Sequence, residues 1–83
     1  MYKVEIVKSA IKELARIPTK EAIRLTEKIN DLRENPRPKG CVKLSGTKNE
    51  YRIRVGNYRV LYTVEDGVLL VHVFKIGNRK DVY

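Results

Sequence analysis

The chain has 83 residues and carries 18 lysines and arginines against 10 aspartates and glutamates, a formal charge of +8. This length predicts a single small domain over residues 1–83 with a modest core. The only cysteine, Cys41, excludes an internal disulfide and a zinc site built on cysteines, which fits a reducing cytoplasm. Nothing resembles a signal peptide and no apolar run approaches membrane-spanning length, so we expect a cytoplasmic protein with no membrane partner.

The positive charge is spread evenly along the chain. Residues 1–40 contain 10 basic and 6 acidic side chains, and residues 41–83 contain 8 and 4. The charge therefore belongs to the folded body and not to a basic tail. It favours a polyanionic partner, nucleic acid or an acidic protein, over a small neutral ligand. A surface that is charged only for solubility is the alternative.

The N-terminal part predicts a strand followed by a short helix. Residues 2–7 alternate apolar and charged side chains, which is typical of a strand. Ser9 is predicted to cap a helix that ends before Pro18. Its buried face is predicted to carry Ile11, Leu14 and Ala15.

A second helix is predicted to begin at Thr19, which can act as its N-cap. Glu21 lies in the first turn, where the helix dipole favours an acidic side chain. The Asn35-Pro36 pair stops the helix, because the residue before a proline resists the helical region. The buried stripe is predicted to consist of Ala22, Leu25, Ile29 and Leu32.

The second half of the chain predicts a sheet. Strands are expected at about residues 42–44, 50–55, 58–65 and 68–76, and Asp66-Gly67 is a hairpin signal between the last two. Residues 68–74 are almost entirely apolar, which suggests a central strand covered on both faces. The predicted fold is therefore α+β: a strand, a two-helix hairpin, then a mostly antiparallel sheet of three to four strands with the helices on one face.

Arginines and apolar residues alternate in the segment Tyr51-Arg52-Ile53-Arg54-Val55. Successive side chains of a strand point to opposite faces, so Arg52 and Arg54 are predicted to stand together on the face that the helices leave open. Guanidinium groups offer a fixed fork of donors and stay charged at any working pH. Two of them on a rigid sheet form a surface suited to phosphate.

Two basic stripes repeat at helical spacing. Lys8, Lys12 and Arg16 lie four apart, as do Lys20, Arg24 and Lys28. A solvated helix face is the simplest interpretation of each. The first stripe has fewer compensating carboxylates, and it is therefore the better candidate for contact with RNA or the ribosome.

Four fragments together resemble the RelE family of bacterial and archaeal toxins, in the wider RelE/ParE superfamily. They are Leu44-Ser45-Gly46, Tyr51-Arg52-Ile53-Arg54-Val55, Gly56-Asn57-Tyr58-Arg59-Val60-Leu61-Tyr62 and Gly77-Asn78-Arg79-Lys80-Asp81-Val82-Tyr83. The resemblance implies a toxin that cuts messenger RNA in the ribosomal A site. It also implies an acidic cognate antitoxin, and binding to operator DNA mainly through that antitoxin.

The implied reaction is attack of the ribose 2′-hydroxyl on the adjacent phosphorus, which needs no metal and no cofactor. The resemblance makes Arg59 a phosphate clamp, Arg79 a charge stabiliser or general acid, and Tyr83 a platform for a base. Arg52 and Arg54 stand where some relatives carry lysines. Because arginine essentially cannot lose its proton, we expect these two to act by electrostatics.

The acid and base of that reaction stay open. Asn78 stands where many relatives have a histidine, a better proton carrier. Glu50 is a weak candidate base. His72 is the only histidine, and no carboxylate or serine lies near it in sequence to orient it, so a packed or partly exposed strand position is favoured.

Two other functions remain compatible with the sequence. One keeps the fold but makes the chain a ParE-like inhibitor of DNA gyrase without nuclease chemistry. The other is a non-enzymatic basic module that binds nucleic acid or the ribosome. Five phosphate- and base-directed side chains, Arg52, Arg54, Arg59, Arg79 and Tyr83, favour the nuclease.

Overall fold

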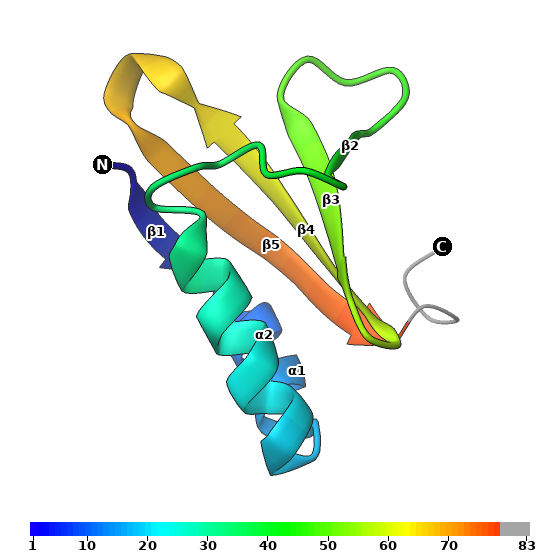
Figure 1. Cartoon of the computed structure of the whole chain (residues 1–83). Coiled ribbons are helices and arrows are strands. Elements are labelled where there is room, and N and C mark those ends of the chain that lie inside the picture. Colours follow the sequence, from blue (N-terminus) through cyan, green and yellow to red (C-terminus); the bar gives the residue numbers. More distant parts are fainter. Residues whose placement is uncertain (79–83) are drawn as a thin grey trace.

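A five-stranded sheet carries two helices on one face (Figure 1). The computed structural model describes residues 1–78. The elements are β1 (Lys3–Ile6), α1 (Lys8–Ala15), α2 (Thr19–Asp31), β2 (Val42–Lys43), β3 (Glu50–Val55), β4 (Tyr58–Glu65) and β5 (Leu70–Asn78), with a 3-10 turn at Asp66–Val68. The strand order is β1-β5-β4-β3-β2, and all pairs are antiparallel except β1 with β5. The predicted α+β fold is confirmed, with β1 joining the sheet as a parallel edge strand.

No helix within residues 1–78 is both long and apolar enough to cross a bilayer.

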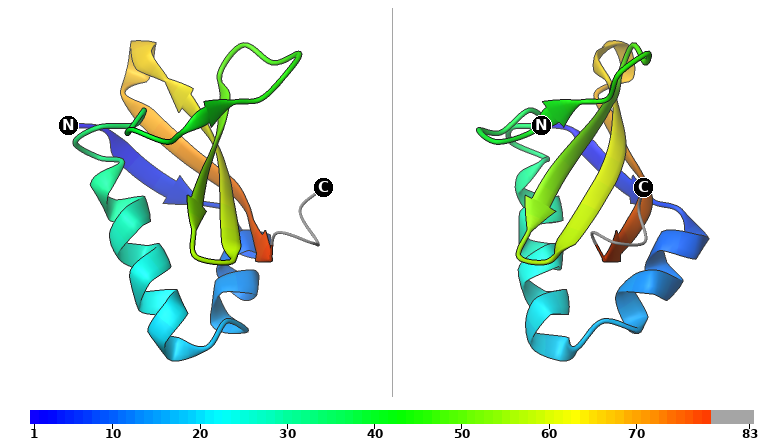
Figure 2. Two further views of the ribbon diagram at one scale, coloured as in Figure 1. Left: turned by 45° about the vertical axis from the view of Figure 1, so that its right-hand side comes forward. Right: turned by 90° about the vertical axis from the view of Figure 1, so that its right-hand side faces the viewer.

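The core lies between the sheet and the two helices. α1 packs beside β5, and α2 packs against β3 (Figure 2). Leu25, Ile29 and Leu32 of the second helix are buried as predicted, whereas Ala22 is half-buried. They meet the apolar face of the sheet, whose buried members are Ile53, Val55, Val60, Tyr62, Val64, Val71, Val73 and Ile76.

The predictions for α1 are partly wrong. The helix begins at Lys8 after Val7, and its N-terminus has no side-chain cap, so Ser9 lies inside the first turn. Ala10 is the fully buried residue and Leu14 is half-buried, whereas Ile11 is 52% exposed and Ala15 is exposed. The helix starts two residues earlier than predicted, with Val7 and not Ser9 at the N-cap position, and its buried face carries positions 10 and 14.

The start of α2 also differs from the prediction. Pro18 is the N-cap and Thr19 is the first helical residue, with no hydrogen bond from a side chain to the free amides. The Pro18 backbone is extended at ψ (141°), and its carbonyl accepts a backbone hydrogen bond of the first turn, from the Ala22 amide at 2.9 Å.

β5 is a central strand along its first half only. It pairs with β4 along its length, but β1 pairs only with residues 70–73. Buried and half-buried side chains alternate along the first part of β5, and Leu70 and His72 are half-exposed on the face away from the helices. The prediction that both faces of this strand are covered is therefore wrong. A register shift at Leu61/Tyr62 adds one residue, Phe74, to β5 and reverses the alternation beyond it.

The turns of both hairpins contain a residue with left-handed backbone. The β3–β4 connection is the two-residue turn Gly56-Asn57 with Gly56 at φ 61°, a conformation that favours glycine. The predicted hairpin at Asp66-Gly67 is confirmed, but it is longer than two residues. It contains the 3-10 turn and ends at Leu69, which has φ 51°.

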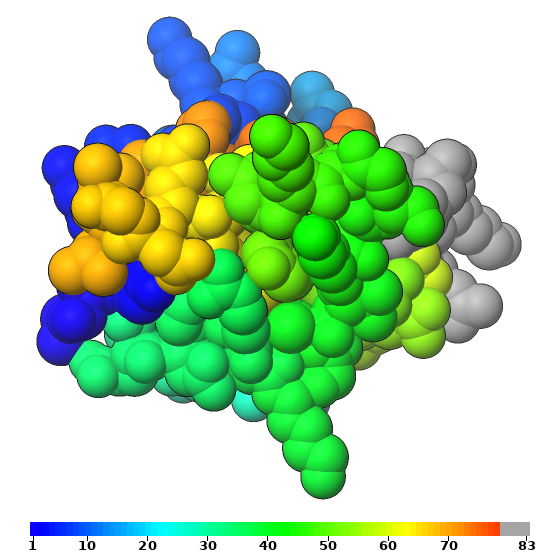
Figure 3. Space-filling model, turned by 90° about the horizontal axis from the view of Figure 1, so that it is seen from above, coloured from blue at the N-terminus to red at the C-terminus, as the bar shows by residue number. Residues whose placement is uncertain are grey.

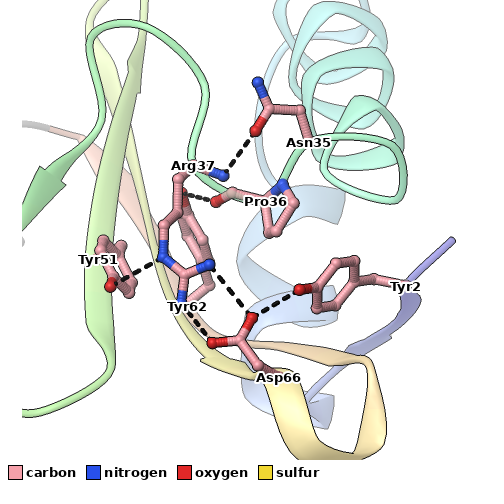
Figure 4. Close-up of polar contacts among 7 residues, drawn as sticks. All are labelled: Tyr2, Asn35, Pro36, Arg37, Tyr51, Tyr62 and Asp66. Atoms are coloured by element: carbon pink, nitrogen blue, oxygen red, sulfur yellow. Dashed lines mark hydrogen bonds and ion pairs between the residues drawn. The ribbon is translucent and has the colours of Figure 1, made fainter.

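A polar cluster ties distant segments together at the end of the sheet away from the β3–β4 turn (Figures 3 and 4). There the N-terminal residues, the connection after α2 and the β4–β5 turn lie side by side. Arg37 donates to both oxygens of Asp66 (2.8 and 3.2 Å) and to the Tyr51 hydroxyl (3.0 Å), and Tyr2 donates to Asp66 (2.5 Å). The hydrogen bonds from Arg37 and then Tyr2 lower the pKa of Asp66 to about 2.

The aromatic part of this cluster extends into the core. The Arg37 guanidinium lies 5.1 Å from the centre of the Tyr51 ring, and Tyr51 stacks on Tyr62 at 6.0 Å. Tyr62 is fully buried and donates to the carbonyl of Pro36 (2.7 Å), and burial raises the pKa of its hydroxyl. These contacts fix the proline-rich connection that leads from α2 to β2.

Candidate functional site

Strand register decides which side chains share the open face of the sheet. Ile53 and Val55 are buried on the helix-covered face, so Arg52 and Arg54, which alternate with them in β3, point the other way. Arg54 pairs directly with Arg59 of β4, and Arg52 pairs with Leu61. The structure therefore brings together three of the five predicted catalytic residues: Arg52 and Arg54 share a face as the alternation in β3 indicated, and the register of β4 adds Arg59.

Arg54 and Arg59 form the centre of this site. Residues directly opposite on antiparallel strands have Cβ atoms about 4.5–5.5 Å apart. Both arginines line a pocket of about 80 Å³ together with Gly56 and Tyr58. Arg59 is half-buried and Arg54 is exposed. Two guanidiniums at this spacing can share one phosphate, since each offers paired donors to a different oxygen.

Arg52 lies one row further along the open face and has a cationic neighbour across β4. Leu61 pairs with Arg52 on one side and with Lys75 of β5 on the other. Leu61 is only 7% exposed, so it forms an apolar floor between the two cations. Sequence reasoning missed Lys75, because simple alternation places it on the face of Val71 and Val73. The bulge in β5 moves it to the open face.

A mixed row of side chains lies beyond Arg52. Glu50 pairs with Thr63, Thr63 with His72, and His72 with Glu5 of β1. His72 thus has a carboxylate as its direct cross-strand neighbour, although none is close in sequence. Parallel pairing of the first strand with the last produces this arrangement, and no local sequence pattern predicts it.

The other predicted residues are placed as follows. Lys8, Lys12 and Arg16 are exposed on α1, and Arg16 forms an ion pair with Glu13 at 3.7 Å. Arg79 and Tyr83 lie outside the described residues.

Metal-ligating and thiol groups give no competing site in the part of the chain that the structure describes. Residues 1–78 contain no group of three or more histidine, cysteine or acidic side chains arranged to hold a metal ion. Cys41 is a free, half-buried cysteine.

Comparisons with known proteins agree on one family. A family model described as the ParE toxin of the type II toxin–antitoxin system parDE matches residues 4–83. The chain is 33% identical over 87 residues to a putative toxin RelE1 of Methanocaldococcus jannaschii, which covers 99% of this chain and 94% of that protein. It is 31% identical to a chain of the archaeal RelE–RelB complex from Pyrococcus horikoshii OT3, with a TM-score of 0.86 and 98% of each chain covered. It is 29% identical to the isolated E. coli RelE toxin, with a TM-score of 0.83, covering 100% of this chain and 92% of that one.

Proposed function

The chain belongs to the RelE family of type II toxin–antitoxin toxins, and from that premise we propose that it is a ribosome-dependent endonuclease that cuts messenger RNA in the A site. Cleavage would proceed by attack of the 2′-hydroxyl on the adjacent phosphorus and would stop translation. The observation that carries the proposal is the direct pairing of Arg54 with Arg59 beside a phosphate-sized pocket on the open face.

The arginine site suits the charge changes of this reaction. The transition state carries extra negative charge on the phosphoryl oxygens, and preorganised cations at that position can lower the barrier by several kcal/mol. Arg59 would clamp the scissile phosphate. Arg52 and Arg54, which stay protonated, would stabilise the developing charge and favour ionisation of the 2′-hydroxyl. Lys75 adds a fourth cation to the same face.

Two further residues complete the proposed site. Arg79 would neutralise charge on the phosphate or the leaving oxygen, and Tyr83 would stack on the substrate base or orient the 2′-hydroxyl. The ribosome would hold the messenger in place, and this alignment can itself supply several kcal/mol. The reaction as proposed needs no metal and no cofactor.

The partners follow from the family and from the charge of the chain. The related RelE chain from Pyrococcus horikoshii is in complex with RelB, and we infer a cognate antitoxin for this chain. A net charge of +8 on a small body favours an acidic antitoxin that folds on contact. Operator DNA would be bound mainly by the antitoxin.

Primer extension in a translation reaction tests the nuclease. We expect new cuts confined to translated message with the wild-type chain, and loss of most cuts with Arg79→Ala and with Arg59→Ala. Uncut message with continuing translation would refute the proposal. Cuts that persist in both variants would show that these arginines are not at the reacting phosphate.

A second candidate is inhibition of DNA gyrase without nuclease activity. The matching family model is described as a ParE toxin, which favours this alternative. A supercoiling assay with purified gyrase separates the two functions, because a gyrase inhibitor would block supercoiling while leaving translated message intact.

A further inference from the structure

Arg54 lies at the junction of two hollows on the surface. One is the pocket that it lines with Arg59 on the open face. The other is a groove of about 170 Å³ beside α2, whose lining includes Arg54, Lys28 of α2 and Lys39 of the connection that follows. The groove lies where β3 extends past β2, because β2 pairs only with Tyr51 and Arg52. The phosphate pocket therefore continues around the edge of the sheet.

Arg24 adds a cation at the β3–β4 turn. Its Nη1 atom lies 3.8 Å from where a Cβ on Gly56 would stand, and Gly56 lines the pocket of Arg54 and Arg59. Arg24 and Lys28 belong to the α2 stripe, so the structure joins this stripe to the arginine site. We call Arg59, Arg54, Arg24, Lys28 and Lys39 the basic belt.

Four members of the basic belt, Arg54, Arg24, Lys28 and Lys39, form no ion pair with another side chain of residues 1–78. The three ion pairs formed within residues 1–78 use other basic side chains, namely Lys3, Arg16 and Arg37. Asp31 is the one acidic residue that lines the groove, against three cations. Arg24 and Lys28 also stand on a helix whose buried residues Leu25 and Ile29 fix its backbone against the sheet.

We propose that the basic belt binds the backbone of the same RNA strand whose phosphate occupies the Arg54–Arg59 pocket. This inference rests on the proposed function and extends it: the strand leaves the pocket past Arg54 and its next phosphates lie over α2. A line of cations that starts at a phosphate site matches the regular negative charge of a nucleic-acid backbone.

Salt dependence of RNA binding tests the belt without requiring cleavage. The probe is a fluorescent oligouridylate with 2′-O-methyl riboses, which cannot be cut, and anisotropy is measured over a series of salt concentrations. For single strands each neutralised phosphate contributes about 0.7 to the slope of log K against log salt. The double variant Arg24→Gln, Lys28→Gln should therefore reduce the slope by about 1.4.

A charge-matched double variant is the control. Lys43→Gln, Lys48→Gln removes the same charge from exposed positions of β2 and of the loop that follows it, and we expect it to leave the slope unchanged. An equal reduction in both double variants, or no reduction in the α2 variant, would overturn the proposal. All four positions are exposed, and unchanged thermal midpoints would verify that the variants are folded.

The cleavage assay and the salt-dependence measurement can refute the nuclease proposal and the basic-belt proposal independently of each other. If the wild-type chain cuts no message but the α2 variant still lowers the slope, the proposed function fails and the basic belt stands. If the α2 variant keeps the slope for RNA and instead loses affinity for a co-expressed acidic antitoxin, the belt is a protein-binding surface and the RNA proposal is wrong.

Discussion

Replacing Arg54 by glutamine should weaken the toxin and stabilise the fold. Arg54 is exposed and lies directly opposite Arg59, so two positive charges face each other across neighbouring strands. Like charges in this arrangement are destabilising, and cross-strand pairs are worth about 0.2–1 kcal/mol. For a domain of this size that corresponds to a rise in Tm of about 1–8 °C. Loss of one transition-state donor should lower the cleavage rate by about 10²–10³.

The assay combines thermal unfolding at low and high salt with cleavage of translated message. The gain in Tm should shrink at 1 M salt, where charges are screened within about 3 Å. Lys48→Gln, a change of the same charge on the exposed loop between β2 and β3, should show neither effect. A variant that unfolds at a lower temperature, independently of salt, would mean that Arg54 supports the fold and would refute the reasoning.

Three further predictions concern the scaffold. The pKa of Asp66 is lowered from about 3.9 to about 2, so its ion pair with Arg37 stabilises the fold above about pH 4 and is lost toward pH 2. The urea midpoint should therefore fall more steeply over that range in the native chain than in Asp66→Asn, and parallel curves would contradict this. Tyr62→Phe leaves a buried carbonyl without its donor and should cost about 1–3 kcal/mol in chemical denaturation, whereas a neutral result would mean that water replaces the hydroxyl. Leu25→Ala should cost about 2–5 kcal/mol and Ile23→Ala less than about 0.5, and similar values for both would contradict the observed burial.

The sequence predicts the order of elements and the second helix well, because these depend on local periodicity. The stripe of Leu25, Ile29 and Leu32 repeats at helical spacing, and all three residues are buried. Ile11 shows the limit of this reasoning. The first helix starts two residues earlier than predicted, and in a helix of two turns the few apolar residues do not fix which face is buried.

The candidate site is predictable where it depends on alternation within one strand, and not where it depends on pairing. Arg52 and Arg54 follow from the period of two in β3. The opposition of Arg54 and Arg59 needs the register of a two-residue turn, which Gly56 makes possible. Lys75 depends on a bulge, and the closeness of His72 to Glu5 depends on a pairing between strands more than sixty residues apart.

That pairing between β1 and β5 also bears on when the molecule can form during synthesis. A chain is made from its N-terminus, and β1 has only β5 as a partner in the sheet. The first strand must therefore wait until residues 70–73 have left the ribosome, although the β3–β4 hairpin with its arginines can close earlier from local contacts. The completed fold is thus delayed until nearly all of the described chain has been translated.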